Sequence, residues 1–384
     1  MNTQNISNNK KKLNVVTLVG TRPEIIRLSR IIDKLDKFCN HFLIHTGQNY
    51  DYELNEIFFD ELGIRKPDEF LNCASDTVAE TIGQVIHKSD KAFVKYKPDA
   101  ILILGDTNSA MAAISAKRRK IPIFHMEAGN RSFDLRVPEE INRKIVDHIS
   151  DINLPYSDIA RSYLIREGIS PDTIIKTGSP LNEVLSYYSR DISNSKILSI
   201  LNLKPYKYFL VSMHREENVD SNKNISKFVI ALNEIAKIYR LPIILSTHPR
   251  TRKKIEELNI KFHKLVNLHK PLGLIDYAYL QVNAKTVLSD SGSLTEESSI
   301  LNFPAINIRD AHERPEGMEE GVAILTGMNI ERILQAIEIT SKQSRTKKRS
   351  LNLVFDYSSD NVSEKVLRLI HSYVDFVNNV VWKK

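Results

Sequence analysis

Short apolar runs alternate with amphipathic stretches along almost the whole chain, and this alternation limits the folds available to it. Stretches with helical periodicity, such as Glu24–Leu35 and Ser109–Arg119, separate the runs. Strands that alternate with helices build parallel sheets whose two faces are both covered. The strand candidates are Leu13–Val19, His41–Thr46, Ala100–Leu104, Pro122–Met126, Asp151–Pro155, Thr173–Thr177, Tyr208–Met213, Pro242–Thr247, Leu265–His269, Lys285–Leu288 and Pro304–Ile308.

These eleven candidates in 384 residues predict an α/β fold with two Rossmann-like, doubly wound domains. The first domain is expected over residues 12–185 and the second over residues 186–361. Residues 1–11 are polar and basic, and we expect them to form a disordered lead-in. No strand follows the last helical pattern, Val362–Val380, so residues 362–384 are expected to form a C-terminal helix that can pack back on the first domain.

The composition narrows the classes of function. Hydrophobic residues make up 42% and charged residues 26%, which suits a globular protein with a substantial core. The formal charge of +7 favours anionic ligands such as nucleotides. Basic residues are spread among acidic ones, which argues against nucleic-acid binding, and no apolar run approaches the ~18 residues of a membrane span. The two cysteines show no metal-binding spacing and fit a reducing compartment, so we expect a cytoplasmic protein.

Open parallel sheets bind ligands at the carboxyl ends of their strands, which directs attention to the polar residues there. After the first strand candidate, Thr21 and Glu24 have the spacing of a capping box, which predicts a structural role for Glu24. Arg22 and Arg27 lie about one turn apart near the same helix N-terminus, a place that attracts anions. Phosphate contact by these two arginines is therefore a candidate function.

Three acidic residues of the first domain follow strands or begin the next helix. Asp106, Glu127 and Glu139 are expected to converge on one edge of the sheet. Clustered carboxyl groups raise each other's pKa, which makes one acid and one base possible near neutral pH. Glu140 is expected on a solvent-facing helix surface. His214, at the end of the first strand of the second domain, is a candidate acid or ligand.

The second domain carries small residues where a helix begins. Ser291, Gly292 and Ser293 allow backbone N–H groups to approach a phosphate at the helix N-terminus. Ser293 and Glu296 again have capping-box spacing, which predicts a local role for Glu296 and leaves Glu297 for ribose hydroxyls. Two further arginines, Arg309 and Arg314, suit a diphosphate. These residues predict a nucleotide-diphosphate site and a carboxylate-rich pocket, but they do not define the reaction.

Six ordered motifs resemble the non-hydrolysing UDP-N-acetylglucosamine 2-epimerase family: GTRPE at 20–24, GDT at 105–107, MEAG at 126–129, PEEINR at 138–143, SDSG at 289–292 and ERPE at 313–316. Their order and spacing match over about residues 13–370. The resemblance implies a glycosyltransferase-B-like fold with the active site between the domains, a UDP-sugar substrate, no cofactor or metal, and a homodimer. It implies C2 inversion by elimination and re-addition of UDP through a glycal intermediate.

The resemblance also assigns roles by motif. Asp106, Glu127 and Glu139 would form the acid/base group, and His214 would assist departure of UDP. Arg22 and Arg314 would hold the diphosphate. The residues expected to cradle phosphate, ribose and uracil are Ser291, Gly292, Ser293, Glu297 and Tyr277.

Several positions depart from the common family pattern. Arg27 stands where lysine is usual, and Ser293 replaces a usual glycine. The stretches Gln48–Tyr52 and Asn130–Asp134 also differ, and both are similar to the branch that makes UDP-N-acetyl-L-fucosamine for capsule or O-antigen. Its substrate is UDP-2-acetamido-2,6-dideoxy-L-talose. The alternatives are the epimerase of UDP-N-acetylglucosamine and UDP-N-acetylmannosamine, a glycosyltransferase on the same fold, and a non-catalytic UDP-sugar-binding protein.

Overall fold

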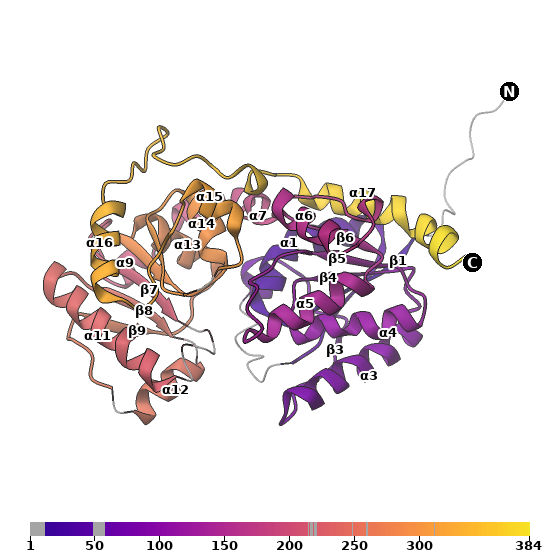
Figure 1. The fold of residues 1–384 in the computed structure, drawn as a ribbon, viewed down its shortest axis with the longest axis horizontal. Helices are drawn as coiled ribbons and strands as arrows, with labels where there is room; N and C mark the ends of the chain where they lie inside the picture. The colour runs from indigo at the N-terminus through magenta and orange to yellow at the C-terminus, as the bar shows by residue number, and fades with distance from the viewer. Residues whose placement is uncertain are drawn as a thin grey trace.

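The computed structural model describes residues 12–48, 58–213, 215, 218, 221–247, 249–258, 260–310 and 312–384. Two α/β domains lie side by side, each built on a six-stranded sheet (Figure 1). The expected lead-in, His214 and residues 49–52 of the stretch Gln48–Tyr52 lie outside the described residues. Every strand pairing within the two sheets is parallel, as the alternation of strands and helices predicts.

The sheet of the first domain has the strand order β3-β2-β1-β4-β5-β6, with β1 and β4 at its centre. Its strands are β1 (Asn14–Val19), β2 (Asn40–His45), β3 (Glu69–Phe70), β4 (Ala100–Leu104), β5 (Ile123–Met126) and β6 (Ile152–Leu154). The helices of this part are α1 (Arg22–Phe38), α3 (Val78–Tyr96), α4 (Ala112–Arg118), α5 (Pro138–Ile149), α6 (Asp158–Arg166), α7 (Leu181–Tyr187) and α8 (Ser189–Asn194). The short helix α9 (Ile197–Ile200) follows them and packs on the second domain.

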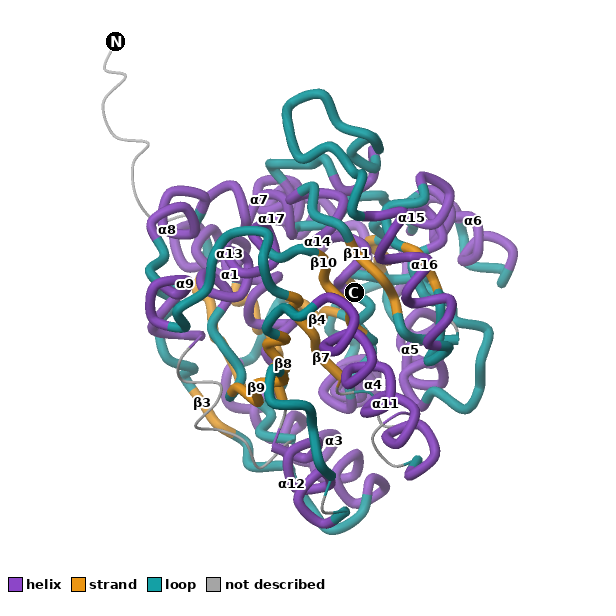
Figure 2. Tube along the Cα trace, turned by 90° about the vertical axis from the view of Figure 1, so that its left-hand side faces the viewer, coloured by secondary structure: helices purple, strands orange, loops and turns teal. Residues whose placement is uncertain are grey.

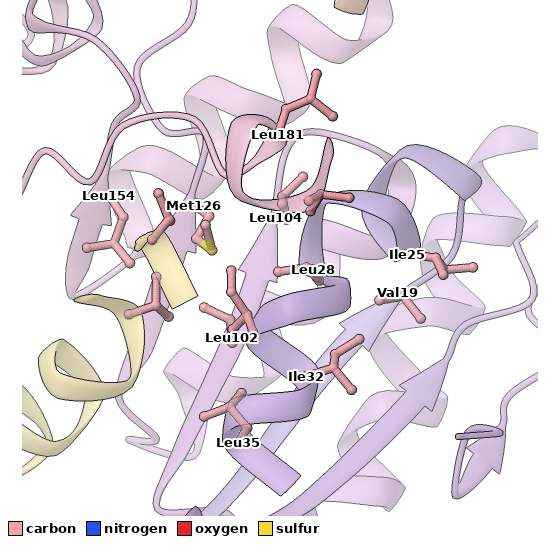
Figure 3. Close-up of a cluster of buried hydrophobic side chains, with 14 of the residues drawn as sticks. Val19, Ile25, Leu28, Ile32, Leu35, Leu102, Leu104, Met126, Leu154 and Leu181 are labelled. Carbon is pink, nitrogen blue, oxygen red and sulfur yellow. The ribbon is translucent and has the colours of Figure 1, made fainter. Parts of the chain in front are cut away.

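Helices cover both faces of this sheet because alternate residues of each strand point to opposite sides. One face packs against α1 and α7, where Leu28 and Ile32 of α1 lie over Leu102 of β4 and Leu181 closes one end of the cluster (Figure 3). The other face packs against α3 and α4, with Ile101 and Ile103 of β4 buried there. Both faces of the sheet are therefore largely apolar, although Thr17, His125 and Asn153 are polar residues buried within its strands.

The second sheet has the order β12-β11-β10-β7-β8-β9. Its strands are β7 (Phe209–Met213), β8 (Ile243–Thr247), β9 (Val266–His269), β10 (Thr286–Ser289), β11 (Ala305–Asn307) and β12 (Ile324–Leu325). The helices are α11 (Asn222–Tyr239), α12 (Pro249–Glu257), α13 (Leu274–Asn283), α14 (Ser293–Leu301), α15 (Pro315–Glu320) and α16 (Ile330–Thr340). Helices α11 and α16 cover one face, and α9, α13 and α14 the other (Figure 2).

After α16 the chain returns to the first domain. Arg345 donates to the backbone carbonyls of Val282 and Lys285, and Arg349 donates to those of Ser299 and Ile300, so these basic residues hold the returning segment on the second domain. The last long helix, α17 (Val362–Phe376), then packs beside α1 on the first domain (Figure 1). It continues as a π-helical turn over Val377–Val381.

The strand predictions fail in three places. Thr173–Thr177 is not a strand, because only Ile174 pairs, as an isolated bridge to Asn153 of β6, and the segment begins in a 3-10 turn. The prediction also missed β3 and β12, which are two residues long and too short to show periodicity. Among the described residues, no helix combines the length and the apolar character that crossing a membrane requires.

Candidate active site

A pocket lies between the two domains at the carboxyl ends of β7, β8 and β10. The first domain contributes the start of α1 and residue Phe58, and the second contributes three strand ends and the starts of α13 and α14. Both domains are therefore needed to form it. The residues that line it are Arg22, Pro23, Ile26, Phe58, Ser212, Ser246, Pro271, Leu272, Gly273, Leu274, Tyr277, Ser289, Ser291, Ser293 and Glu297.

The polar side chains of this pocket are held by hydrogen bonds. The Tyr277 hydroxyl donates to Ser212 Oγ at 3.3 Å, and Gln281 Nε2 donates to Glu297 at 2.5 Å. The hydroxyls of Ser291 and Ser293 lie 2.9 Å apart at the start of α14, whose N-cap is Gly292. Burial raises the pKa of Glu297 above its usual value. This part of the pocket offers hydroxyls, a carboxyl group and a helix N-terminus to a ligand.

Arg22 faces the same pocket from the first domain. Its guanidinium lies over the ring of Phe58, 5.6 Å from the ring centroid, a cation–π arrangement. The pocket therefore presents a positive charge opposite the serines of α14.

Asp106 and Glu127 follow β4 and β5, which are neighbours in the sheet. Arg143, on α5, joins them. Its Nη2 donates to Asp106 and lies 3.5 Å from Glu127 Oε1, while its Nη1 donates to the backbone carbonyl of Glu127 at 2.6 Å. Sequence reasoning missed Arg143, although it lies within the PEEINR motif. Its position four residues after Glu139, on the same helix face, was the available signal.

The pKa values of Asp106 and Glu127 are shifted in opposite directions. Burial raises the pKa of Asp106 to about 6; Arg143 opposes the rise, while Glu313 and Glu127 add to it. Burial also acts to raise the pKa of Glu127, but the nearby Arg314, Arg27 and Arg143 outweigh it and lower the pKa below the usual range. Near neutral pH, Glu127 is therefore ionised, whereas Asp106 exchanges a proton.

Glu139 lies close enough to Asp106 for its charge to add to the rise of the Asp106 pKa, but no hydrogen bond or ion pair among the described residues joins it to this pair. It is partly exposed at the start of α5, and its Oε1 is 3.8 Å from Arg215 Nη1. Its neighbour Glu140 was expected on a solvent-facing surface, and that prediction is wrong. Glu140 is buried because it accepts hydrogen bonds from the backbone N–H and the hydroxyl of Ser132 at 2.9 and 3.1 Å. The short stretch after Gly129 is thereby fixed on α5.

Glu296 does not have the local role that its spacing predicts. The helix N-cap is Gly292 rather than Ser293, and the side chain of Glu296 is fully buried between the domains. Its carboxylate accepts two bonds from Arg27, each 2.8 Å, one from Arg314 Nε at 2.8 Å, and one from the Ser179 hydroxyl at 2.5 Å. Glu296 is thus the centre of a buried ion-pair network that connects the two domains.

Arg27 and Arg314 use their guanidinium nitrogens differently in this network. Arg27 uses both terminal nitrogens on Glu296. Arg314 uses Nε on Glu296 and Nη2 on Glu127, at 2.9 Å, and its buried Nη1 has no hydrogen-bond partner among the described residues. Arg314 therefore keeps the two N–H groups of Nη1 for a ligand. Arg309, the other arginine of this region, lies 3.2 Å from Glu313.

Glu24 has the structural role that its capping box predicts. Its carboxylate accepts from the backbone N–H groups of Gly20 and Thr21 at 2.5 and 3.1 Å, and also from the Thr107 hydroxyl at 2.6 Å. Because Thr107 follows Asp106 in the chain, the bond from Thr107 to Glu24 also holds the turn that carries Asp106. Burial raises the pKa of Glu24 to about 7.

Two parallel-sheet domains, a pocket with anion-binding groups between them and a buried carboxylate–arginine cluster beside it define an α/β enzyme of the glycosyltransferase-B-like class. The sequence profile of the UDP-N-acetylglucosamine 2-epimerase family matches residues 33–371, and the chain belongs to this family. Family membership makes the protein a UDP-sugar 2-epimerase.

Individual relatives match over nearly the whole chain. A UDP-N-acetylglucosamine 2-epimerase of Methanocaldococcus jannaschii is 37% identical over 368 residues, 94% of this chain and 98% of the relative. Its structure with UDP-GlcNAc and UDP gives a TM-score of 0.87 at 36% identity, covering 93% and 99% of the two chains. A UDP-N-acetylglucosamine 2-epimerase structure from Rickettsia bellii gives 0.90 at 50% identity, covering 97% and 100%. A UDP-2,3-diacetamido-2,3-dideoxy-D-glucuronate 2-epimerase of Pseudomonas aeruginosa is 32% identical over 329 residues, 84% and 91%.

Proposed function

We propose that this epimerase interconverts UDP-2-acetamido-2,6-dideoxy-L-talose and UDP-N-acetyl-L-fucosamine by elimination and re-addition of UDP. The observation that carries the reaction class is the pairing of Asp106 and Glu127 through Arg143 beside the pocket between the domains. Groups of unlike pKa at one place are what proton removal and return at a carbon atom require.

The chemistry balances without an added reagent. A base removes the C2 proton while the C1–O bond breaks, its electron pair leaves with UDP, and a C1–C2 double bond forms. Return of UDP oxygen to C1 and of a proton to the opposite face of C2 gives the epimer. Asp106 is proposed to exchange the proton near neutral pH. Glu127 and Glu139 are proposed as the other members of the acid/base group, and His214 remains the candidate that assists UDP departure.

The leaving diphosphate needs positive charge as the C1–O bond breaks. We assign this role to Arg22, which faces the pocket, and to Arg314, whose Nη1 is available. The start of α14, with Ser291, Gly292 and Ser293, adds backbone N–H groups and the positive end of the helix dipole. Glu297 and Tyr277 are proposed to contact ribose and uracil, and Arg27 supports the site through Glu296.

The choice of sugar depends on the two stretches, Gln48–Tyr52 and Asn130–Asp134, that depart from the common family pattern. The likeness of the stretch Asn130–Asp134 to the UDP-N-acetyl-L-fucosamine branch supports the proposed sugar. Arg131, buried between Asp147 at 2.7 Å and Glu167 at 2.6 Å, anchors this stretch. The name of the archaeal relative favours the alternative, UDP-N-acetylglucosamine. The P. aeruginosa relative is named for a different sugar, so membership of the family leaves the sugar open.

Incubation in heavy water with UDP-2-acetamido-2,6-dideoxy-L-talose and, separately, with UDP-N-acetylglucosamine, followed by NMR of C2, tests both the reaction class and the sugar. We expect an epimer with deuterium at C2 from the L-talose compound, and loss of this exchange in Asp106→Asn. Turnover of UDP-N-acetylglucosamine alone would reject the proposed sugar but keep the reaction class. A glycosyltransferase would leave C2 without deuterium in both cases.

The resemblance also supports a cytoplasmic homodimer that supplies capsule or O-antigen synthesis, and sedimentation of the purified protein tests the dimer.

A further inference from the structure

Glu61 of the first domain caps a helix of the second. It belongs to the helical turn at residues 58–61, and its carboxylate accepts from the backbone N–H groups of Leu274 at 2.7 Å and Ile275 at 3.1 Å. These donors belong to the first turn of α13, where backbone N–H groups lack partners within the helix. The N-cap residue of α13 is Gly273, which has no side chain to supply the cap. The cap comes instead from a residue 213 positions earlier.

Gly273 fits this contact by its lack of a side chain. A Cβ at this position would lie 2.4 to 2.6 Å from the carboxyl atoms of Glu61, which are the three nearest heavy atoms. The backbone angles of Gly273, φ −66° and ψ 170°, are open to any residue. A Cβ at this position would therefore displace the carboxyl group of Glu61, so glycine permits the cap, although the backbone conformation does not demand it.

Both segments joined by the Glu61 cap, the turn at residues 58–61 and helix α13, also contribute residues to the lining of the nucleotide pocket. Phe58, on the turn that carries Glu61, lines the pocket and lies beneath the guanidinium of Arg22. On the other side, Tyr277 lines the pocket and donates its backbone N–H to Gly273 at 3.0 Å. Leu274 packs against the apolar cluster that the first domain shares with α13 and α14 of the second. The position of Tyr277 relative to Arg22 therefore depends on how α13 is seated on residues 58–62.

We propose that Glu61 is a positioning residue of the nucleotide site, which sets α13 and Tyr277 against Arg22 by capping the helix across the two domains. The proposal rests on the proposed function for the identity of the nucleotide. A carboxylate at a helix N-terminus is favourable both as an acceptor and through the helix dipole. Because the cap and a nucleotide that touches both domains favour the same arrangement, loss of the cap weakens nucleotide binding.

A double-mutant cycle with calorimetric binding of UDP tests this, using Glu61→Ala, Gly273→Ala and the double variant. We expect each single substitution to raise the Kd for UDP about five- to tenfold, the size of a lost helix cap. In the double variant the alanine Cβ no longer meets the carboxyl group, so its Kd should be close to that of Glu61→Ala alone. Glu61→Gln, which keeps the shape but offers only one acceptor oxygen, should fall between Glu61→Ala and the unsubstituted protein.

Asp60→Asn is the matched control, because Asp60 is exposed on the same turn and its carboxylate makes no hydrogen bond to α13 among the described residues. Its Kd should be unchanged. In turnover, the Glu61 variants should raise KM and leave kcat within about twofold, as expected for lost binding that is equal in ground and transition states. A merely structural residue would lower the active fraction and the Tm without this split.

An unchanged Kd in Glu61→Ala would overturn the proposal, and so would additive effects of the two substitutions. UDP binding by the unsubstituted protein separately tests the proposed function. If UDP does not bind, thermal unfolding of the same four proteins still measures the coupling between Glu61 and Gly273. Non-additive Tm changes would then support the cap, and additive changes would overturn it.

Discussion

Arg314 Nη2 lies 2.9 Å from Glu127 Oε1, so an arginine of the second domain neutralises a carboxylate of the first. The same guanidinium holds Glu296 through Nε, and the third nitrogen, Nη1, is left for a ligand. A single side chain therefore connects the proposed acid/base cluster to the proposed diphosphate site. Departure of UDP would change the charge beside Arg314, and through it the proton affinity of Glu127.

Replacement of Arg314 by lysine tests this link. Lysine keeps the charge but cannot bridge Glu127 and Glu296 with separate nitrogens in a fixed plane. We expect kcat/KM to fall about 100-fold or more, in the range measured when one partner of a buried charged pair is lost. Steady-state kinetics with the UDP-sugar measures the effect. Arg332→Lys, an exposed arginine on α16, is the control, and equal activity of the two variants would contradict the role of Arg314.

Glu296→Gln should destabilise the fold strongly. The substitution removes the charge that balances Arg27 and Arg314 in a fully buried place. Breaking a buried ion pair costs about 3 to 5 kcal/mol because it leaves an uncompensated charge. Urea unfolding measures the loss. Adding Arg27→Met to Glu296→Gln should recover part of it, since one unbalanced charge is then removed. A double variant less stable than the single one would contradict this account.

The arrangement of strands and helices was readable from the sequence because buried parallel strands are continuous apolar runs. Leu102 and Leu104, for example, alternate with Ile101 and Ile103, and all four are buried. The two-residue strands β3 and β12 carry no such pattern, since their pairing depends on neighbouring strands already in place. Length decides which strands a sequence reveals.

The sequence predicts the site residues that lie at strand ends, but not those whose role depends on partners far away in the chain. Asp106 and Glu127 follow neighbouring strands, and a parallel sheet brings such residues together. Glu296 carries an equally plausible local pattern, but its partner Arg27 is 269 residues away, and packing of the two domains decides the outcome. A motif of four residues cannot contain that information.

The pH dependence of C2–H exchange should show the state of Asp106. Its pKa is raised from 3.8 to about 6 by burial, with the negative charge of Glu313 adding to the rise. If ionised Asp106 accepts the proton, kcat/KM rises with pH through about 6. Glu313→Gln removes a like charge, which lowers the pKa of Asp106 and moves this rise to lower pH. A pH profile of deuterium incorporation measures both. A shift to higher pH in Glu313→Gln would contradict the assignment.

Glu24 should make the stability of the protein depend on pH. Its pKa is about 7 in the folded protein, against an ordinary 4.5, because it is buried. Between these two values the folded state keeps a proton that the unfolded state has lost, so stability falls as pH rises from 4.5 to 7, by on the order of 3 kcal/mol at most. Glu24→Gln removes this loss, and urea unfolding of both proteins at pH 5 and pH 8 should show the wild type losing its advantage at pH 8.

Glu80→Gln is the control: Glu80 occupies the same capping-box position on α3 but faces solvent, so its substitution should change stability equally at both pH values. The same pH-independent difference for Glu24→Gln would show that Glu24 does not retain a proton on folding.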